Sequence, residues 1–164
     1  MKIAPIPHNE KERLAALHAL LILDTPPEQR FDRITAFAAS EFDVPIALIS
    51  LVDENRQWFK SKFGLDVCET SRDLAFCAHA LQSTEPLIVP NALDDERFFD
   101  NPLVAGPPHI RFYTGAPLVL PSGVIAVTLC LIDTQARELD TTDLAILETL
   151  RDLAVIELIE QGKS

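Results

Sequence analysis

Apolar residues recur with two different periods along the chain, and the changes of period predict where helices and strands lie. Leucines three and four residues apart predict a first helix over residues 10–23, which follows a capping signal at Asn9. The run Thr25-Pro26-Pro27-Glu28 is a second start signal, with Thr25 as the cap. A second helix is therefore predicted to continue to about Glu41.

The middle of the chain contains short apolar runs bounded by turn residues, which predict strands. The first two runs, over residues 46–52 and 56–63, are close enough to form a hairpin. Further elements are predicted as strands over 86–89, 110–120 and 124–132, a short helix over 73–81, an irregular stretch over 91–108 and a last helix over 140–160. Hairpins dominate this order, which indicates an α+β fold with a mainly antiparallel sheet.

Composition and charge narrow the function classes. The chain has 164 residues, 48% of them apolar and 24% charged, which is typical of one folded domain over residues 1–164 with a core from about 9 to 160. The net charge of -11 repels phosphates and anionic lipids, so neither nucleic acid nor a membrane is an expected partner. A cytoplasmic location is expected, because no apolar run is long enough to cross a bilayer and no signal peptide is evident.

The three cysteines, Cys68, Cys77 and Cys130, match no disulfide or zinc framework, so reduced thiols are expected. Cys77 and His79 raise two alternatives, a metal site and a cysteine nucleophile. Residues two apart face different directions on a helix, and no orienting carboxylate can be placed beside the pair. We therefore expect no metal site and no catalytic residue, with Cys77 and Cys130 as buried free thiols. Cys77 and His79 alternatively line a ligand pocket.

The irregular stretch and the strand after it carry further polar candidates. Asp94 lies in an acidic cluster that is typical of a solvated turn, but Asn91 and Asp94 become ligand contacts if this stretch folds over a pocket. Arg111 either pairs with an acidic residue or binds a carboxylate or phosphate of a ligand. Tyr113 and Trp58 either pack in the core or stack on a ligand.

Several short motifs occur in an order that resembles one known family. They are Ile22-Leu-Asp-Thr-Pro-Pro27, Ser50-Leu-Val-Asp53, Arg56-Gln-Trp-Phe-Lys60, Phe76-Cys-Ala-His79, Arg111-Phe-Tyr113, Gly115-Ala-Pro-Leu118 and Thr128-Leu-Cys-Leu-Ile-Asp133. On this basis, over about residues 9–160, the chain resembles the GAF domains of bacterial signalling proteins. One departure is Val127, where relatives often carry glycine; if that face of the strand lines the pocket, the side chain makes the pocket smaller.

The resemblance implies a PAS-related fold and a sensory function. It implies an antiparallel sheet of five or six strands, with the first and last helices together on one face and a ligand pocket on the other, under loops and a short helix. It also implies regulation of an output domain such as a kinase, cyclase or phosphodiesterase. The candidate ligand-binding residues are Phe76, Cys77, His79, Asn91, Asp94, Arg111, Tyr113 and Thr128. The sequence identifies neither the small-molecule ligand nor a cofactor.

The alternative function is a GAF-fold thiol enzyme that reduces free methionine sulfoxide. Such reductases use a catalytic cysteine in the loop before the fourth strand, which here corresponds to residues 91–108. That stretch contains no cysteine, so a function without catalysis is favoured.

The last helix also predicts self-association. Its apolar residues, Ile156 among them, cover more than the single face that a helix needs to pack on a sheet. We expect a homodimer through the terminal helices; the alternative is that these helices simply cover one another within one chain.

Overall fold

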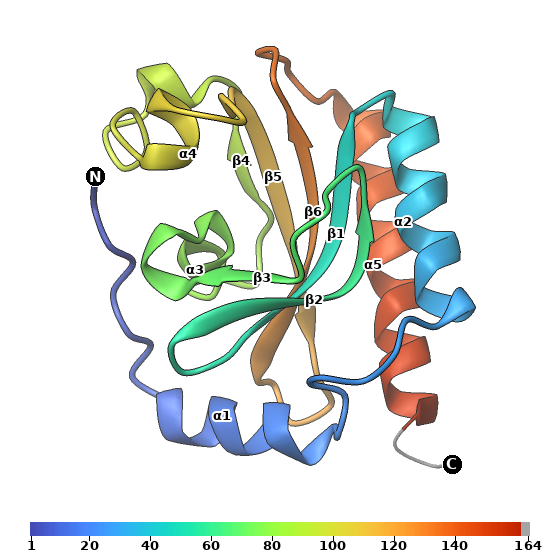
Figure 1. Cartoon of the computed structure of the whole chain (residues 1–164). Helices are drawn as coiled ribbons and strands as arrows, with labels where there is room; N and C mark the ends of the chain where they lie inside the picture. The colour runs from blue at the N-terminus through green and yellow to red at the C-terminus, as the bar shows by residue number, and fades with distance from the viewer. Residues whose placement is uncertain (162–164) are drawn as a thin grey trace.

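All neighbouring strands of the sheet are antiparallel, in the order β3-β2-β1-β6-β5-β4 (Figure 1). The computed structural model describes residues 1–161. The strands are β1 (Ile46–Val52), β2 (Arg56–Phe63), β3 (Glu69–Ser71), β4 (Leu87–Val89), β5 (Phe112–Val119) and β6 (Ile125–Asp133). The predicted α+β class and the antiparallel sheet are confirmed.

Two long helices, α2 (Gln29–Phe42) and α5 (Thr141–Gln161), lie side by side on one face of the sheet (Figure 1). In α5 the buried residues recur at helical spacing, at Leu147, Leu150, Ala154 and Leu158, and they pack against the apolar residues of α2 and the sheet. This larger of two hydrophobic clusters therefore joins α2, α5 and one face of β1, β5 and β6.

The family resemblance implies that the first and last helices lie together, but this pairing is wrong for the present chain. The helix beside α5 is α2. The first helix, α1 (Glu10–Ala19), lies across the end of the sheet, near the β1–β2 turn (Figure 1). It ends four residues before the predicted boundary, because the chain turns sharply at Leu21 and Asp24, which both have positive φ. These turns direct the chain towards α2.

The Leu-Asp-Thr-Pro motif ties the α1–α2 connection to β2. Thr25 does not cap α2, contrary to the prediction; the helix starts after Glu28 without a side-chain cap. Instead the Thr25 hydroxyl accepts a hydrogen bond from the buried ammonium of Lys60, 2.8 Å away, and the Glu28 carboxylate lies 2.7 Å from the same ammonium. Asp24 is likewise 2.8 Å from Arg56.

An ion-pair network fixes α1 to the rest of the molecule. Arg13 is almost completely buried and donates to the carbonyl of Val52 and to the Glu10 carboxylate. Arg72 donates to the same carboxylate from the 3-10 turn Arg72–Leu74. Partial burial raises the pKa of Glu10, but hydrogen bonds from Arg13 and Arg72 outweigh it and lower this pKa to about 2.

Short helices and a folded segment cover the other face of the sheet. They are α3 (Phe76–Ala80), a 3-10 turn (Ala92–Asp94) and α4 (Pro102–Ala105), with residues 1–7 crossing outside α3 (Figure 1). The stretch 91–108, predicted as irregular, thus contains two helical turns, and Asn91 and Asn101 cap them. The short strand β3 is also absent from the sequence prediction.

Candidate functional site

A row of polar side chains, buried except for the half-buried Thr70 at its end, crosses the sheet on the face that α3 covers. Thr70 accepts a hydrogen bond from Gln57 at 2.9 Å, and the Gln57 carbonyl accepts one from Ser50 at 2.7 Å. Ser50 is paired with Thr128 in the β1–β6 register, and Thr128 Oγ1 lies 3.0 Å from Cys130 Sγ. The row leads from the β3 edge to the centre of the sheet, where it meets two thiols.

The thiol cluster, defined as Cys77, Tyr113, Thr128 and Cys130, lies at the end of this row. The Sγ atoms of Cys77 and Cys130 are 2.8 Å apart, and both cysteines are free thiols. Tyr113 donates its hydroxyl hydrogen to Cys77 Sγ at 3.0 Å, with Cys130 Sγ 3.5 Å away. All four residues are buried, which confirms the predicted burial of Cys77 and Cys130.

Strand register and one glycine determine this geometry. Gly115 pairs with Cys130 across β5 and β6, and Tyr113 lies two residues earlier on the same face of β5. A Cβ atom at Gly115 would lie 2.2 Å from the Tyr113 hydroxyl oxygen. Only glycine therefore lets the phenol ring cross β5 and reach the thiols. Cys77 approaches from the first turn of α3.

The electrostatics of the cluster favour a single negative charge, on Cys77. Burial raises the pKa of the Cys77 thiol, but hydrogen bonds with Cys130, Thr128, Tyr113 and Ser50 outweigh it and lower this pKa to about 7. Burial and the neighbouring Cys77 raise the pKa of Cys130 well above its usual range, and the pKa of Tyr113 rises mainly through burial. Since the two thiols titrate together, ionisation of one suppresses ionisation of the other.

An aromatic stack, defined as Phe76, His79, Phe98 and Tyr113, closes the cluster from the outside. The rings of Phe76 and Phe98 are parallel, with centroids 4.1 Å apart, and Phe76 also contacts Tyr113 at 5.1 Å. The edge of His79 packs on Phe98, and its Nε2 lies 3.1 Å from the carbonyl oxygen of Lys2. Burial lowers the pKa of His79, which favours the neutral ring.

The remaining candidate residues have local partners outside the thiol cluster. Asn91 accepts from the backbone N–H of Leu93, and Asp94 is exposed. Arg111 donates to the carbonyls of Val104 and Ile110, so its partners are neither an acidic side chain nor the cluster. Asn91 and Arg111 hold the covering segment, residues 91–110, in place, whereas Asp94 lies on its exposed surface.

Four of the eight candidate residues thus meet at one point, namely Phe76, Cys77, Tyr113 and Thr128, with His79 at the outer side of the stack. Cys130, Ser50 and Gln57 were not predicted as members of this site. Ser50 and Cys130 each interrupt a largely apolar strand, which is a signal in the sequence, but assigning them a common position also requires the β1–β6 register.

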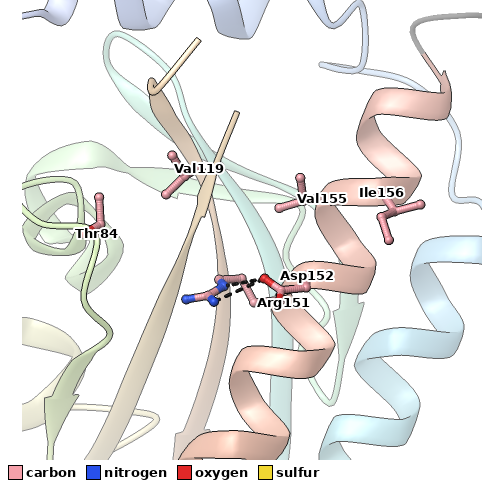
Figure 2. A pocket seen from close by; sticks show the side chains of 6 residues that line it. All are labelled: Thr84, Val119, Arg151, Asp152, Val155 and Ile156. Carbon is pink, nitrogen blue, oxygen red and sulfur yellow. Dashed lines mark hydrogen bonds and ion pairs between the residues drawn. The ribbon is translucent and has the colours of Figure 1, made fainter. Parts of the chain in front are cut away.

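Open hollows lie on the surface, away from the thiol cluster. One of about 380 Å³ is lined by Thr84, Val119, Arg151, Asp152, Val155 and Ile156, and Figure 2 shows it beside α5, with Arg151 paired to Asp152. A second, also of about 380 Å³, lies between α2 and α5 and includes Phe37 and Leu153. The first hollow thus borders α5 alone of the two long helices, and the second borders both.

Comparisons with known proteins identify the family. A model of the GAF domain family matches residues 26–158. The chain belongs to the GAF domain family. It is 41% identical over 159 residues to "Cyclic di-GMP phosphodiesterase PA2567" of Pseudomonas aeruginosa, a match that covers 96% of this chain but only 27% of the relative. The chain therefore corresponds to about a quarter of that protein.

Solved structures confirm the GAF fold. The GAF domain of an Acinetobacter phosphoenolpyruvate-protein phosphotransferase has a TM-score of 0.63 at 20% identity, covering 91% of this chain and 94% of that one. A type II free methionine-R-sulfoxide reductase from Thermoplasma acidophilum also has a TM-score of 0.63, at 12% identity, with 80% and 91% coverage. This fold also occurs in signalling proteins. A domain of a Sinorhizobium meliloti sensor histidine kinase has a TM-score of 0.54 at 14% identity, covering 78% of this chain and 88% of that one.

Residues 1–161 contain neither a candidate membrane-spanning helix nor a cluster of metal-ligating side chains. No helix in this range combines the length and apolar character that membrane crossing requires. In the same range, no three His, Cys, Asp or Glu side chains are arranged to hold a metal ion.

Proposed function

We propose that this chain is the sensory domain of a signalling protein, in which a small molecule bound at the aromatic stack changes the position of α5 and thereby an output domain. The observation that carries the proposal is that β6 has the thiol cluster on one face and α5 on the other. Cys130 belongs to the cluster, while its neighbours Leu129 and Leu131 pack in the hydrophobic core with α5. Because side chains alternate along a strand, a displacement of β6 reaches both faces.

The site's chemistry indicates the class of ligand. The aromatic stack and the apolar residues around it offer a flat, largely apolar surface, and the thiol cluster beneath it offers a few hydrogen-bonding groups. This combination suits a planar molecule that carries one or two polar groups. Phe98 occupies the space above Phe76, so such a ligand enters when the covering segment 91–110 moves outwards.

Regulation of an output domain is supported by the relative from Pseudomonas aeruginosa. That protein is named as a cyclic di-GMP phosphodiesterase, and this chain matches only 27% of it. In our proposal the chain acts on a domain of that kind through α5, and itself performs no catalysis. The cysteine-free segment 91–108 lies over the thiol cluster, which supports a binding role over the reductase alternative.

The coupling between the two faces is testable by hydrogen exchange. In Tyr113→Phe the hydrogen bond to Cys77 is lost, and we expect faster amide exchange in β6 and α5, whereas Asp66→Asn on an exposed turn leaves the wild-type pattern. Unchanged exchange in α5 would contradict the coupling. The same measurement with added nucleotides, amino acids or tetrapyrroles locates binding: protection in 91–110 supports the proposed site, and protection elsewhere contradicts it.

A further inference from the structure

We propose that Cys77 and Cys130 form a reversible oxidation site, at which hydrogen peroxide joins the two thiols in an intramolecular disulfide. The proposal depends neither on a bound ligand nor on an output domain, so it goes beyond the proposed function. It rests on three features of the thiol cluster: the distance between the sulfur atoms, the hydrogen-bonding groups around them, and the elements that carry them.

The distance between the thiols is the first argument. Their Sγ atoms are 2.8 Å apart, and an S–S bond of about 2.05 Å requires them to approach by only about 0.8 Å more. Cys130 lies in a central strand of the sheet, whereas Cys77 lies in a five-residue helix that follows a 3-10 turn. A small shift of α3 towards β6 therefore closes the distance without disturbing the strand.

The surroundings of the thiols are the second argument. The Tyr113 hydroxyl donates to Cys77 Sγ, and the Thr128 hydroxyl lies 3.0 Å from Cys130 Sγ, so both sulfur atoms have a polar neighbour in an apolar core. The lowered pKa of Cys77 provides a thiolate near neutral pH, and the thiolate is the reactive form. Cys77 is accordingly the attacking sulfur.

The reaction balances in two steps. The Cys77 thiolate attacks one oxygen of hydrogen peroxide, the O–O bond breaks, and the departing hydroxide takes a proton to leave as water. Cys77 is then a sulfenic acid. The sulfur of Cys130 loses its proton and attacks the Cys77 sulfur; the S–S bond forms, the S–O bond breaks, and a second water leaves. Two thiols lose two electrons to one peroxide, and an added dithiol reverses the change.

The aromatic stack controls access to this site. Cys77 and Cys130 are buried beneath Phe76 and Phe98, and peroxide must pass this cover to reach the thiolate. Removal of the Phe98 ring opens the outer layer of the stack, whereas it leaves the thiols and Tyr113 in place. The oxidation rate consequently reports on the opening of the covering segment.

The test is treatment of the purified, reduced chain with hydrogen peroxide, followed by denaturation, thiol titration and peptide mapping. We expect two of the three thiols to be lost, the mass to fall by two hydrogen atoms, and the peptides with Cys77 and Cys130 to be linked. Dithiothreitol should restore both thiols. Cys68→Ser should behave like wild type, and Phe98→Ala should oxidise several-fold faster.

Three results would overturn the proposal: retention of all three thiols, a cross-link that contains Cys68, or stable addition of oxygen to Cys77 without a cross-link. The variants Cys77→Ser and Cys130→Ser should each form no intramolecular link. Because the peptide map of the wild-type chain decides the question by itself, the result does not depend on the folding of either variant.

Discussion

Side chains of the Leu-Asp-Thr-Pro motif show why local rules misplace individual residues. Capping a helix contributes about 1 kcal/mol, whereas leaving a buried charged donor without one of its partners costs about 1–3 kcal/mol or more. The Lys60 ammonium is buried, and its partners are the Thr25 hydroxyl, the Pro26 carbonyl and the Glu28 carboxylate. The larger effect wins, so Thr25 faces Lys60 and not the first turn of α2. No such competition arises at the start of α5, where the carboxylates of Asp140 and Asp143 each accept a hydrogen bond from the other's backbone N–H.

The close approach of Tyr113 to Gly115 predicts the effect of one methyl group. Gly115→Ala places Cβ against the phenol hydroxyl, and we expect a loss of about 1–3 kcal/mol in the free energy of unfolding, as for an overpacked core. In a Tyr113→Phe background the same substitution should cost less, because the closest contact is with the hydroxyl oxygen. Chemical denaturation of the four proteins measures this cycle, and equal costs in both backgrounds would argue against the contact.

Elements differ in how well the sequence predicts them, and length explains the difference. The bounds of β1 and β2 were predicted to the residue, because each has a long apolar or alternating pattern between clear turn residues. The strand β3 and the helix α4 have three and four residues, too few for any period to be read. Their formation depends on other elements, namely on β2 for β3 and on the aromatic stack for the segment around α4.

The attachment of α1 should depend on pH through Glu10. Its pKa falls from 4.5 to about 2 on folding, so its contribution is complete above pH 4.5 and disappears as the pH drops towards 2. We expect the melting temperature to fall over that interval. Glu10→Gln should flatten this dependence and cost roughly 2–4 kcal/mol at neutral pH, since two buried or partly buried arginines lose their carboxylate.

Exposed Glu12 provides the matched control, because it lies on the same helix and has neither arginine as a partner in the structure. Thermal unfolding of Glu12→Gln should follow the wild-type profile between pH 5 and pH 2 within about 0.5 kcal/mol. An identical acid dependence in wild type and Glu10→Gln would show that other carboxylates dominate.

For the whole molecule, the sequence predicted the fold class but not how the two faces are built. The pattern of apolar positions indicates that a sheet has helices against it, and the family motifs imply an antiparallel sheet of five or six strands. Neither shows that Ser50 and Thr128 are opposite each other, because shifting a strand by two residues preserves the same apolar pattern. The polar row, and with it the position of Cys130 beside Cys77, therefore became clear only from the structure.

The expected self-association of the terminal helices is carried here by the outer surface of α5 and of α2 beside it, because the first helix lies at the end of the sheet. Phe37, Leu153 and Ile156 are 53%, 46% and 52% exposed on this surface, which also borders the two hollows. A two-fold dimer would bury these side chains. In Ile156→Glu both copies would place a charge in the interface, so we expect the dissociation constant of the dimer to rise at least about tenfold. Val67→Glu, equally exposed in the β2–β3 loop, should not change it. Sedimentation equilibrium measures the oligomeric state. A wild-type chain that is monomeric at high micromolar concentration would contradict the predicted dimer.

The pairing of β1 with β6 has a consequence for the order of folding. The β1–β2 and β5–β6 hairpins join residues that are near in sequence, and they can form early, whereas the β1–β6 ladder joins the two halves of the chain. Closing the long intervening loop costs chain entropy before any contact across the ladder is gained. Ser50 therefore meets Thr128 late, and the two thiols spend the early stages of folding without Ser50 as a polar neighbour. Newly made chains would be most open to irreversible thiol oxidation in that interval, before the ladder closes.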